Sequence, residues 1–289
     1  MNEQKHIVCH SGGHSSAIVA IEVVRKFGKE NVILLNHDIS TTTEDEDIKR
    51  FKKEVADYLG LPITYANING IDNPNDLPDQ FDVCMTAGAM TDSSGHALCT
   101  AKLKTEPFYD YLAANHLQYN TLFGSENSPI IYYGFDMSET VRVNRRYAVL
   151  GSMGYRTDFP LARWVERTIY STKEIGIEPP NTYSVWKHAN CKGCLKASLL
   201  HWYVTYVHAI IQYEKAVLLE MKVNFTVHTV IRNGIKIAVS LDELRPIFKQ
   251  LHCEGFPATE HQSEIKFANK LRQYGLQEES NVKPCECIT

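Results

Sequence analysis

From Lys5 to Ile177, short continuous apolar runs alternate with longer stretches in which apolar residues recur at every third or fourth position. The short runs are typical of buried strands, and the longer stretches are typical of amphipathic helices. This alternation predicts an α/β fold with an open, mainly parallel sheet and helices on both faces. The expected strands are 6–9, 32–36, 63–66, 121–124 and 130–135, and the expected helices are 15–27, 44–59, 105–115, 138–150 and 161–175.

The pattern changes after Cys194, so we divide the chain into a nucleotide-binding α/β domain at 1–190 and a mostly helical region at 191–289. Residues 68–82 have no period and are expected to form a loop. Two β-rich runs, 226–232 and 235–240, flank Asn233-Gly234 and predict a hairpin; short helices are expected at 242–251 and 261–271. One helix of about 25 residues is expected before the hairpin, with a packed face or a dimer contact made by Trp202, Tyr203, Tyr206 and Tyr213.

The composition of the chain excludes several classes of protein but does not indicate a function. The 289 residues are 44% hydrophobic and 22% charged, which is ordinary for a globular chain. No segment has the roughly 20 apolar residues of a membrane span, and the polar amino terminus is unlike a signal peptide, so we expect a cytoplasmic protein. Its eight cysteines are then not a disulfide framework. A net charge of -4 argues against binding nucleic acid by bulk charge, although a local basic groove stays possible.

A glycine pair follows the first expected strand and leads directly into a helix. Glycine lets the backbone approach an anion, and the helix amino terminus adds unpaired N–H groups and a favourable dipole. The alternative is a tight turn capped by Ser15. The expected phosphate-binding residues are Ser11, Gly12, Gly13, His14, Ser15 and Ser16. His37 and Asp38 follow the second strand, at the edge where open α/β sheets bind ligands, so they are candidates to face a nucleotide.

This loop resembles that of the PP-loop family of adenine-nucleotide-binding proteins, which reads Ser-Gly-Gly-x-Asp-Ser. Ser15 stands where that family usually has Asp. Later segments resemble the branch that contains phosphoadenosine phosphosulfate (PAPS) reductase. In order they are Cys99 to Phe108, Gly134 to Arg142, Phe159 to Trp164, and Cys191 to Cys194. The resemblance covers about residues 5 to 200. It implies an adenine-nucleotide alpha-hydrolase-like fold and a bound adenine nucleotide, ATP or PAPS.

The physical roles of these positions agree with the resemblance. Lys104 and Arg142 stand at expected helix starts, where a long cation can reach phosphate or sulfate oxygens. Glu139 is expected to orient Arg142 or a ribose hydroxyl. Asp136 stands where the family often has Arg, and a carboxylate there repels a polyanion.

Cys191-Lys192-Gly193-Cys194 has a spacing that suits zinc, an iron–sulfur cluster or a redox pair. The resemblance implies a 4Fe–4S cluster held by cysteines. Three of the cysteine positions that hold it in the family are matched in this chain, by Cys99, Cys191 and Cys194. Three cysteines could leave one iron of such a cluster open. Alternatively, His96 or His188 could complete a zinc site as the fourth ligand, or the cysteines could be buried or redox thiols without a metal. Cys287, in Cys285-Glu286-Cys287-Ile288, resembles the cysteine that attacks sulfur in sulfonucleotide reductases; otherwise it belongs to a mobile tail.

Two enzymatic hypotheses follow. The chain either reduces a bound sulfonucleotide with the help of a thiol reductant, or uses ATP to activate a nucleic-acid acceptor for a sulfur donor. The alternative is a degenerate PP-loop protein that binds a nucleotide or a partner without turnover and uses the metal structurally. Ser15 and Asp136 favour that alternative. We also expect a homo-oligomer.

Overall fold

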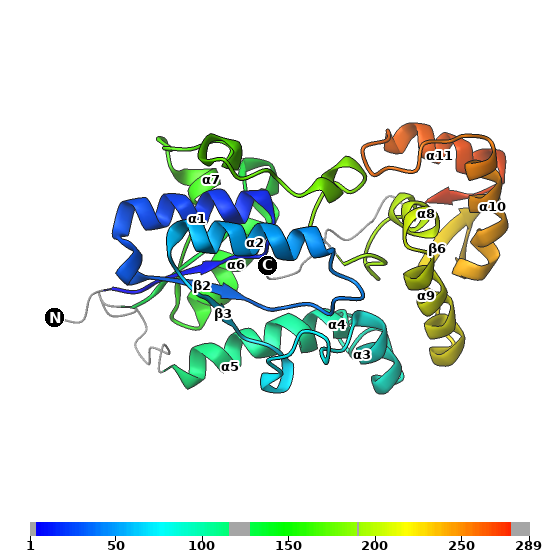
Figure 1. The fold of residues 1–289 in the computed structure, drawn as a ribbon. Helices are drawn as coiled ribbons and strands as arrows, with labels where there is room; N and C mark the ends of the chain where they lie inside the picture. The colour runs from blue at the N-terminus through cyan, green and yellow to red at the C-terminus, as the bar shows by residue number, and fades with distance from the viewer. Residues whose placement is uncertain (1–3, 116–127, 190, 279–289) are drawn as a thin grey trace.

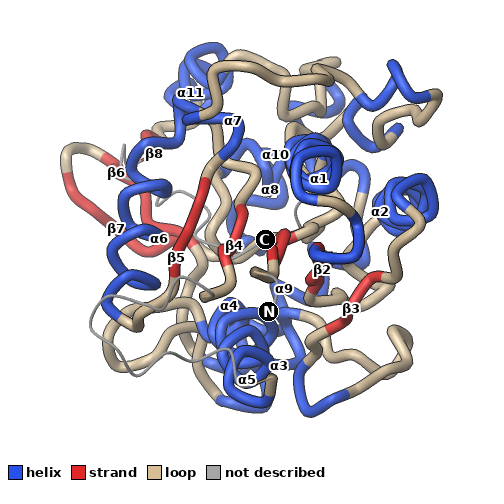
Figure 2. Tube along the Cα trace, turned by 90° about the vertical axis from the view of Figure 1, so that its left-hand side faces the viewer, coloured by secondary structure: helices blue, strands red, loops and turns tan. Residues whose placement is uncertain are grey.

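The computed structural model describes residues 4–115, 128–189 and 191–278. Its larger sheet is parallel, with the strand order β3-β2-β1-β4-β5, and Figure 2 shows β5, β4, β2 and β3 following one another. The α/β fold with a mainly parallel sheet is therefore confirmed. The expected strand at 121–124 lies outside the described residues, and the edge strand β5 was not predicted. The strands are β1 (His6–Cys9), β2 (Val32–Asn36), β3 (Ile63–Tyr65), β4 (Ile130–Tyr132) and β5 (Arg156–Asp158).

Helices cover both faces of this sheet, as the alternating pattern predicts (Figure 1). On one face, α1 (His14–Phe27) and α2 (Glu46–Leu59) bury their apolar sides against β1 and β2. On the other, α5 (Glu106–Ala114) and α6 (Thr140–Ser152) pack against β1 and β4. The bounds of α2 follow from its caps: the Asp45 carboxylate accepts from Asp47 N, and Gly60 ends the helix with a φ of 62°.

The prediction of a helix at 161–175 is wrong. Only α7 (Pro160–Arg163) and a 3₁₀ turn at Thr172–Ile175 form there. The buried carboxylate of Glu22 on α1 accepts hydrogen bonds from the backbone N–H groups of Thr168 and Ile169. Because these donors are tied to α1, they cannot join a helical ladder of their own.

The prediction of a loop at 68–82 is correct only for the first part of this range. It contains a 3₁₀ turn at Ile68–Gly70 and ends where α3 (Gln80–Ala87) begins, at the capping box of Asp79. A second unpredicted helix, α4 (Leu98–Thr100), continues through a π-helical turn, Ala101–Thr105, into α5. The remaining 3₁₀ turns are Lys29–Asn31, Met137–Glu139 and Asn181–Ser184.

The carboxy-terminal region follows the expected order of elements, with two differences: one expected helix is divided, and a short strand is added at the end. The single helix of about 25 residues is two helices, since Ala209 has non-helical angles (φ -144°, ψ 56°). The hairpin is confirmed, because Asn233 (φ 53°) and Gly234 (φ 77°) both adopt the left-handed conformation of its turn. The elements are α8 (Leu199–His208), α9 (Ile210–Val223), β6 (His228–Arg232), β7 (Ile235–Val239), α10 (Leu241–Cys253), α11 (Glu264–Gln273) and the unpredicted β8 (Gln277–Glu278).

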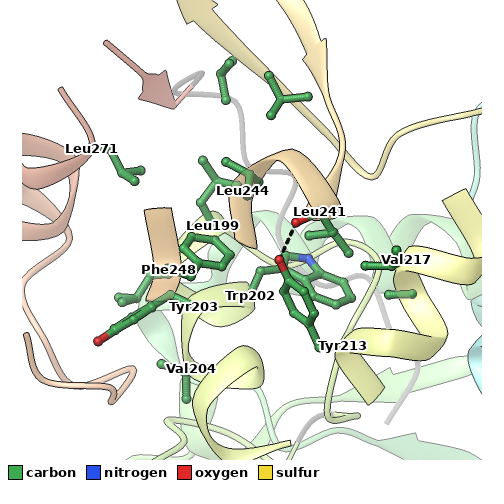
Figure 3. Close-up of a cluster of buried hydrophobic side chains, with 14 of the residues drawn as sticks. Leu199, Trp202, Tyr203, Val204, Tyr213, Val217, Leu241, Leu244, Phe248 and Leu271 are labelled. Carbon is green, nitrogen blue, oxygen red and sulfur yellow. Dashed lines mark hydrogen bonds between the residues drawn. The ribbon is translucent and has the colours of Figure 1, made fainter. Parts of the chain in front are cut away.

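The core of this region is aromatic (Figure 3). Trp202, Tyr203 and Tyr213 are completely buried, and the Tyr213 hydroxyl donates to the carbonyl of Leu241. The packed face expected for these aromatic residues is therefore confirmed. Phe81 of α3 belongs to the same core, which joins the end of the loop after β3 to the carboxy-terminal region. None of the helices in the described ranges is both long and apolar enough to cross a membrane.

Candidate functional site

The sheet has one point at which the order of its strands reverses. From β1 the chain first builds β2 and β3 on one side and later β4 and β5 on the other. The segments that leave β1 and β4 therefore diverge at neighbouring carboxyl ends, which is where open α/β sheets bind ligands. The glycine loop follows β1, so the predicted phosphate-binding residues lie at this switch point.

The glycine loop is held in shape by its own hydroxyl groups. Ser11 Oγ donates to Ser16 Oγ (3.0 Å), and Ser16 Oγ donates to the carbonyl of Gly13 (2.8 Å). Gly12 has a φ of 81°, and a Cβ there would lie 2.8 Å from Ile48 Cγ2, so the position requires glycine. The N-cap residue of α1 is Gly13, without a side-chain cap, and the first turn contains no acidic residue. The positive end of the helix dipole is therefore not neutralised from within α1.

The segment that follows β4 packs directly on the first turn of α1. A Cβ on Gly134 would lie 2.8 Å from Ser16 N and 2.9 Å from Ser15 C, both backbone atoms. Beyond it, the Asp136 carboxylate accepts hydrogen bonds from Ser138 N (2.7 Å) and Ser138 Oγ (2.6 Å). The two loops of the switch point thus meet without a side chain between them.

Glu139 and Arg142 form the contact that was expected of them. Arg142 donates to the Glu139 carboxylate, and its guanidinium carbon lies 4.2 Å from the centroid of the Phe135 ring. This contact lies on the β4 side of the switch point, and the orienting role of Glu139 stays a prediction.

A pocket of about 470 Å³ opens between these two loops. This volume is in the range of small-molecule sites. The glycine loop, the segment after β4 and the segment after α7 each contribute, so the pocket joins the predicted phosphate loop to residues from distant parts of the sequence. Its lining residues are His14, Ser15, Ile18, Asp136, Met137, Ser138, Leu161, Arg167 and Tyr170.

Tyr183 covers the glycine loop, and sequence reasoning missed it. The backbone N–H of His14 donates to the Tyr183 hydroxyl (3.1 Å). A Cβ on Gly13 would lie 3.6 Å from that hydroxyl and 3.8 Å from Ala189 Cβ. His261 of the carboxy-terminal region holds the segment in place through the Tyr183 carbonyl (2.7 Å). No spacing pattern in the sequence connects residue 183 to the loop.

His14 is neutral in this arrangement. Its Nε2 accepts a hydrogen bond from Thr172 N (3.3 Å), which requires that nitrogen to be unprotonated. Burial lowers the pKa of His14, in the same direction. The Nδ1 nitrogen of the neutral ring then carries the proton and can serve as a donor at the edge of the pocket.

His37 and Asp38 lie at the end of β2, as expected. Their side chains, however, form hydrogen bonds and ion pairs with other residues of the chain. His37 Nδ1 donates to the carbonyl of Ala66 (2.6 Å), and burial lowers its pKa to about 4. Asp38 accepts from Lys49 (2.6 Å) and from Lys52 (2.8 Å). Burial alone would raise the pKa of Asp38, but the two lysines hold it below its usual value. Neither residue is among those that line the 470 Å³ pocket.

Lys104 is buried in the π-helical turn, on the β2 side of the switch point. Burial of His37 is the main cause of its lowered pKa, and the positive charge of Lys104 lowers that pKa further, so the two side chains lie near each other. The two predicted cations are thus placed differently: Lys104 lies with His37, and Arg142 lies with Glu139 beyond β4.

The Cys191–Cys194 turn is fixed by bonds to its backbone. Gln80 Nε2 donates to the carbonyls of Lys192 (2.8 Å) and Gly193 (3.1 Å), and Cys194 N donates to His201 Nε2 (3.0 Å). Within the described residues, no three His, Cys, Asp or Glu side chains are grouped so as to hold a metal ion. As placed, Cys99, Cys191 and Cys194 do not form a ligand set for zinc or a cluster. Cys287 lies outside the described residues.

Comparisons with models of protein families, with curated proteins and with solved structures find no match for this chain.

Proposed function

We propose that the chain binds an adenine nucleotide at the carboxyl ends of β1 and β4, with a phosphate group on the loop from Ser11 to Ser16. The observation that carries the proposal is the amino terminus of α1, which has glycine at its N-cap and no acidic residue in its first turn, lies at the switch point of the sheet and borders the 470 Å³ pocket. Unpaired N–H groups and the helix dipole favour an anion at such a position. The choice of adenine rests on the resemblance to the PP-loop family.

The charged groups around the pocket fit a polyanion better than a neutral ligand. Arg167 lines the pocket, and the His14 ring presents a protonated Nδ1 nearby. The negative charge of Asp136 is partly satisfied by the two hydrogen bonds from Ser138. Arg142 can add a second cation from α6, held in orientation by Glu139.

Two reactions of such a bound nucleotide are consistent with the resemblance. In the first, a cysteine thiolate, for which Cys287 is the candidate, attacks the sulfur of PAPS, the nucleotide leaves, and a thiol reductant releases sulfite. In the second, a nucleic-acid oxygen attacks the α-phosphate of ATP, pyrophosphate leaves, and a sulfur donor then displaces AMP. Lys104 and Arg142 would bind phosphate or sulfate oxygens in either case.

Binding without turnover is the second candidate function, and two residues favour it. Ser15 provides no carboxylate where the resembled loop has Asp, and Asp136 places one in the lining of the pocket where the family often has a cation. The cluster or zinc site, the homo-oligomer and the sulfur-donating or nucleic-acid partners stay predictions.

The test is calorimetry of the full chain with ATP, PAPS and phosphoadenosine phosphate under reducing, anaerobic conditions. We expect binding that Gly13→Ala weakens at least about tenfold, because the added methyl group stands over the loop where the phosphate has to sit. The fold tolerates this change, since the nearest atoms to such a Cβ are 3.5 Å away.

Gly151→Ala is the matched control, because no atom beyond the neighbouring backbone of α6 lies within 4 Å of a Cβ at that position. It should bind as the wild type does. Equal affinity of Gly13→Ala and wild type, or no binding of any of the three nucleotides, contradicts the proposal. Release of pyrophosphate or sulfite by the bound complex then identifies the reaction, and binding with neither product supports the second candidate.

A further inference from the structure

Four cationic side chains lie beside the proposed nucleotide pocket, on the segment at 163–170 and on the last turn of α1. The segment follows α7, which packs against α1 (Figure 1). The backbone N–H of Thr168 donates to the buried Glu22 carboxylate of α1, and this bond fixes the segment on that helix. The four cations are Arg25, Lys26, Arg163 and Arg167.

Three of these cations lie over aromatic rings. Tyr147 is 56% exposed and Tyr170 is 64% exposed, so both rings are accessible from solvent. The indole N–H of Trp164 donates to the Asp158 carboxylate (2.9 Å), which holds that ring in place. Positive charge and ordered ring faces therefore occur together on this surface. The pairs, with the distance from the Lys nitrogen or the guanidinium carbon to the ring centroid, are Lys26 over Trp164 (4.0 Å), Arg163 over Tyr147 (5.4 Å) and Arg167 over Tyr170 (4.8 Å).

Carboxylates do not neutralise these cations within the described ranges. A typical surface cation of this chain has an acidic partner, as Lys53 has in Asp57 (2.6 Å). In the part of the chain that the structure describes, none of the four forms an ion pair, and Arg25 donates instead to the Thr168 hydroxyl (2.7 Å). Glu166 is an exposed carboxylate on the same segment. The surface therefore keeps a local positive charge, although the whole chain has a net charge of -4.

This cation–aromatic surface is continuous with the pocket, since Arg167 and Tyr170 belong to both. Ile18 of α1 also lines the pocket. Lys26 lies about 12 Å further along the axis of the same helix, at the helical rise per residue. A linear polyanion that enters the pocket with one end therefore meets further cations outside it.

We propose that the cation–aromatic surface binds a single-stranded nucleic acid, one nucleotide of which reaches the pocket. Cations bind the phosphates of a strand, and exposed rings stack on its unpaired bases, so a strand uses both components of this surface. An acidic protein would use the cations but has no bases for the rings. That the strand meets a bound nucleotide in the pocket rests on the proposed function, whereas binding of the strand to the surface does not.

The experiment measures the fluorescence anisotropy of a labelled oligothymidine of about 16 nucleotides, titrated with the full chain. We expect the logarithm of the association constant to fall linearly with the logarithm of the salt concentration, with a slope of about -2 to -3 for three or four phosphate contacts. Lys26→Gln and Arg163→Gln should each weaken binding about threefold or more at low salt and reduce the slope by about 0.7. Lys249→Gln on α10 and Arg272→Gln on α11 are exposed controls with the same change in charge, and they should bind as the wild type does.

Two further variants test the chemistry of the partner. Tyr147→Ala should weaken binding of the strand at least about fivefold, because a stacked base is lost, and should not affect binding of polyglutamate. Glu166→Gln should strengthen binding of the strand, because it removes an exposed negative charge from the segment.

The affinity for ATP separates this inference from the proposed function. Lys26→Gln and Arg163→Gln should not change it, because neither residue lines the pocket, and Gly13→Ala should weaken ATP without weakening the strand. Binding of the strand by a chain that does not bind ATP contradicts the proposed function alone. Absence of strand binding, equal affinity of Lys26→Gln, Arg163→Gln and their controls, or tighter binding of polyglutamate or phosphatidylserine vesicles than of the strand would overturn the inference.

Discussion

At the scale of single residues, Tyr183 decides how open the phosphate loop is. Its hydroxyl accepts the hydrogen bond from His14 N, one of the first N–H groups of α1. Burial raises the pKa of Tyr183, so the hydroxyl stays neutral and competes with a phosphate only as a weak acceptor. A nucleotide that takes this N–H has to displace the hydroxyl, and the segment held by His261 has to give way with it.

Tyr183→Phe should therefore bind ATP more tightly than the wild type. The change removes the competing hydroxyl and keeps the ring, and one hydrogen bond of about 0.5–1.5 kcal/mol corresponds to an increase of about 2- to 10-fold. Calorimetry measures it, with Tyr147→Phe as the control because Tyr147 is exposed on α6. A weaker affinity would mean that the hydroxyl donates to the ligand, and the competition argument would be wrong.

At the scale of elements, the contact between the loop after β4 and the first turn of α1 holds the two halves of the site together. Gly134→Ala would place a methyl group 2.8 Å from Ser16 N. Because the neighbours are backbone atoms, the two loops have to separate, so we expect a loss of about 1–3 kcal/mol in the free energy of unfolding together with loss of ATP binding.

Urea denaturation and calorimetry check the two effects separately, and Gly151→Ala serves again as the glycine-to-alanine control. If Gly134→Ala matches that control in both measurements, the close approach of the two loops does not matter for stability or for binding.

How far the sequence predicts these elements depends on whether their determinants are local. The strands at 6–9 and 32–36 are continuous apolar runs, and both are observed at the expected residues. Strand β5 is Arg-Thr-Asp and has no apolar signal. Ala209 ends α8 with neither glycine nor proline, and the Glu22 carboxylate that prevents a helix at 161–175 comes from a distant part of the chain.

The site divides in the same way. The glycine loop is a contiguous motif, and its place at the end of β1 follows from the order of strand and helix. Tyr183 acts through a contact with a residue far away in the sequence, and a single sequence contains no signal for such a contact. Asp38 was expected at the right edge, but its two lysine partners are on the following helix, and only the packing of α2 shows that they take its charge.

At the scale of the whole molecule, the segments that follow β2 and β3 join the sheet to the carboxy-terminal region. Lys192 N donates to the carbonyl of Thr43 (3.0 Å), and Lys192 Nζ pairs with Asp45 (2.8 Å). Lys215 on α9 pairs with the buried Asp79 at the start of α3 (2.6 Å). Since these links use charged groups and buried backbone, the stability of the molecule should respond to protonation.

The response to acid should begin with buried histidines. Burial lowers the pKa values of His10, His37 and His228 to about 4, from an ordinary value near 6.5. Between these two values the unfolded chain binds more protons than the folded chain, so stability is full above about pH 6.5 and falls as the pH decreases towards 4. Each histidine contributes at most about 1.4 kcal/mol per pH unit. Asp38, whose pKa is lowered, adds a further loss of the same sign below its unfolded value.

Urea midpoints measured from neutral pH down to about pH 4.5 should therefore fall steeply in the range where free histidine titrates. His10→Asn should reduce that slope, because His10 is completely buried behind the glycine loop, where its Nε2 contacts the Lys52 carbonyl (3.0 Å). His252→Asn, at an exposed position on α10, should leave the slope unchanged. Equal slopes for His10→Asn and wild type would contradict the assignment, since His10 would then take up its proton without unfolding the chain.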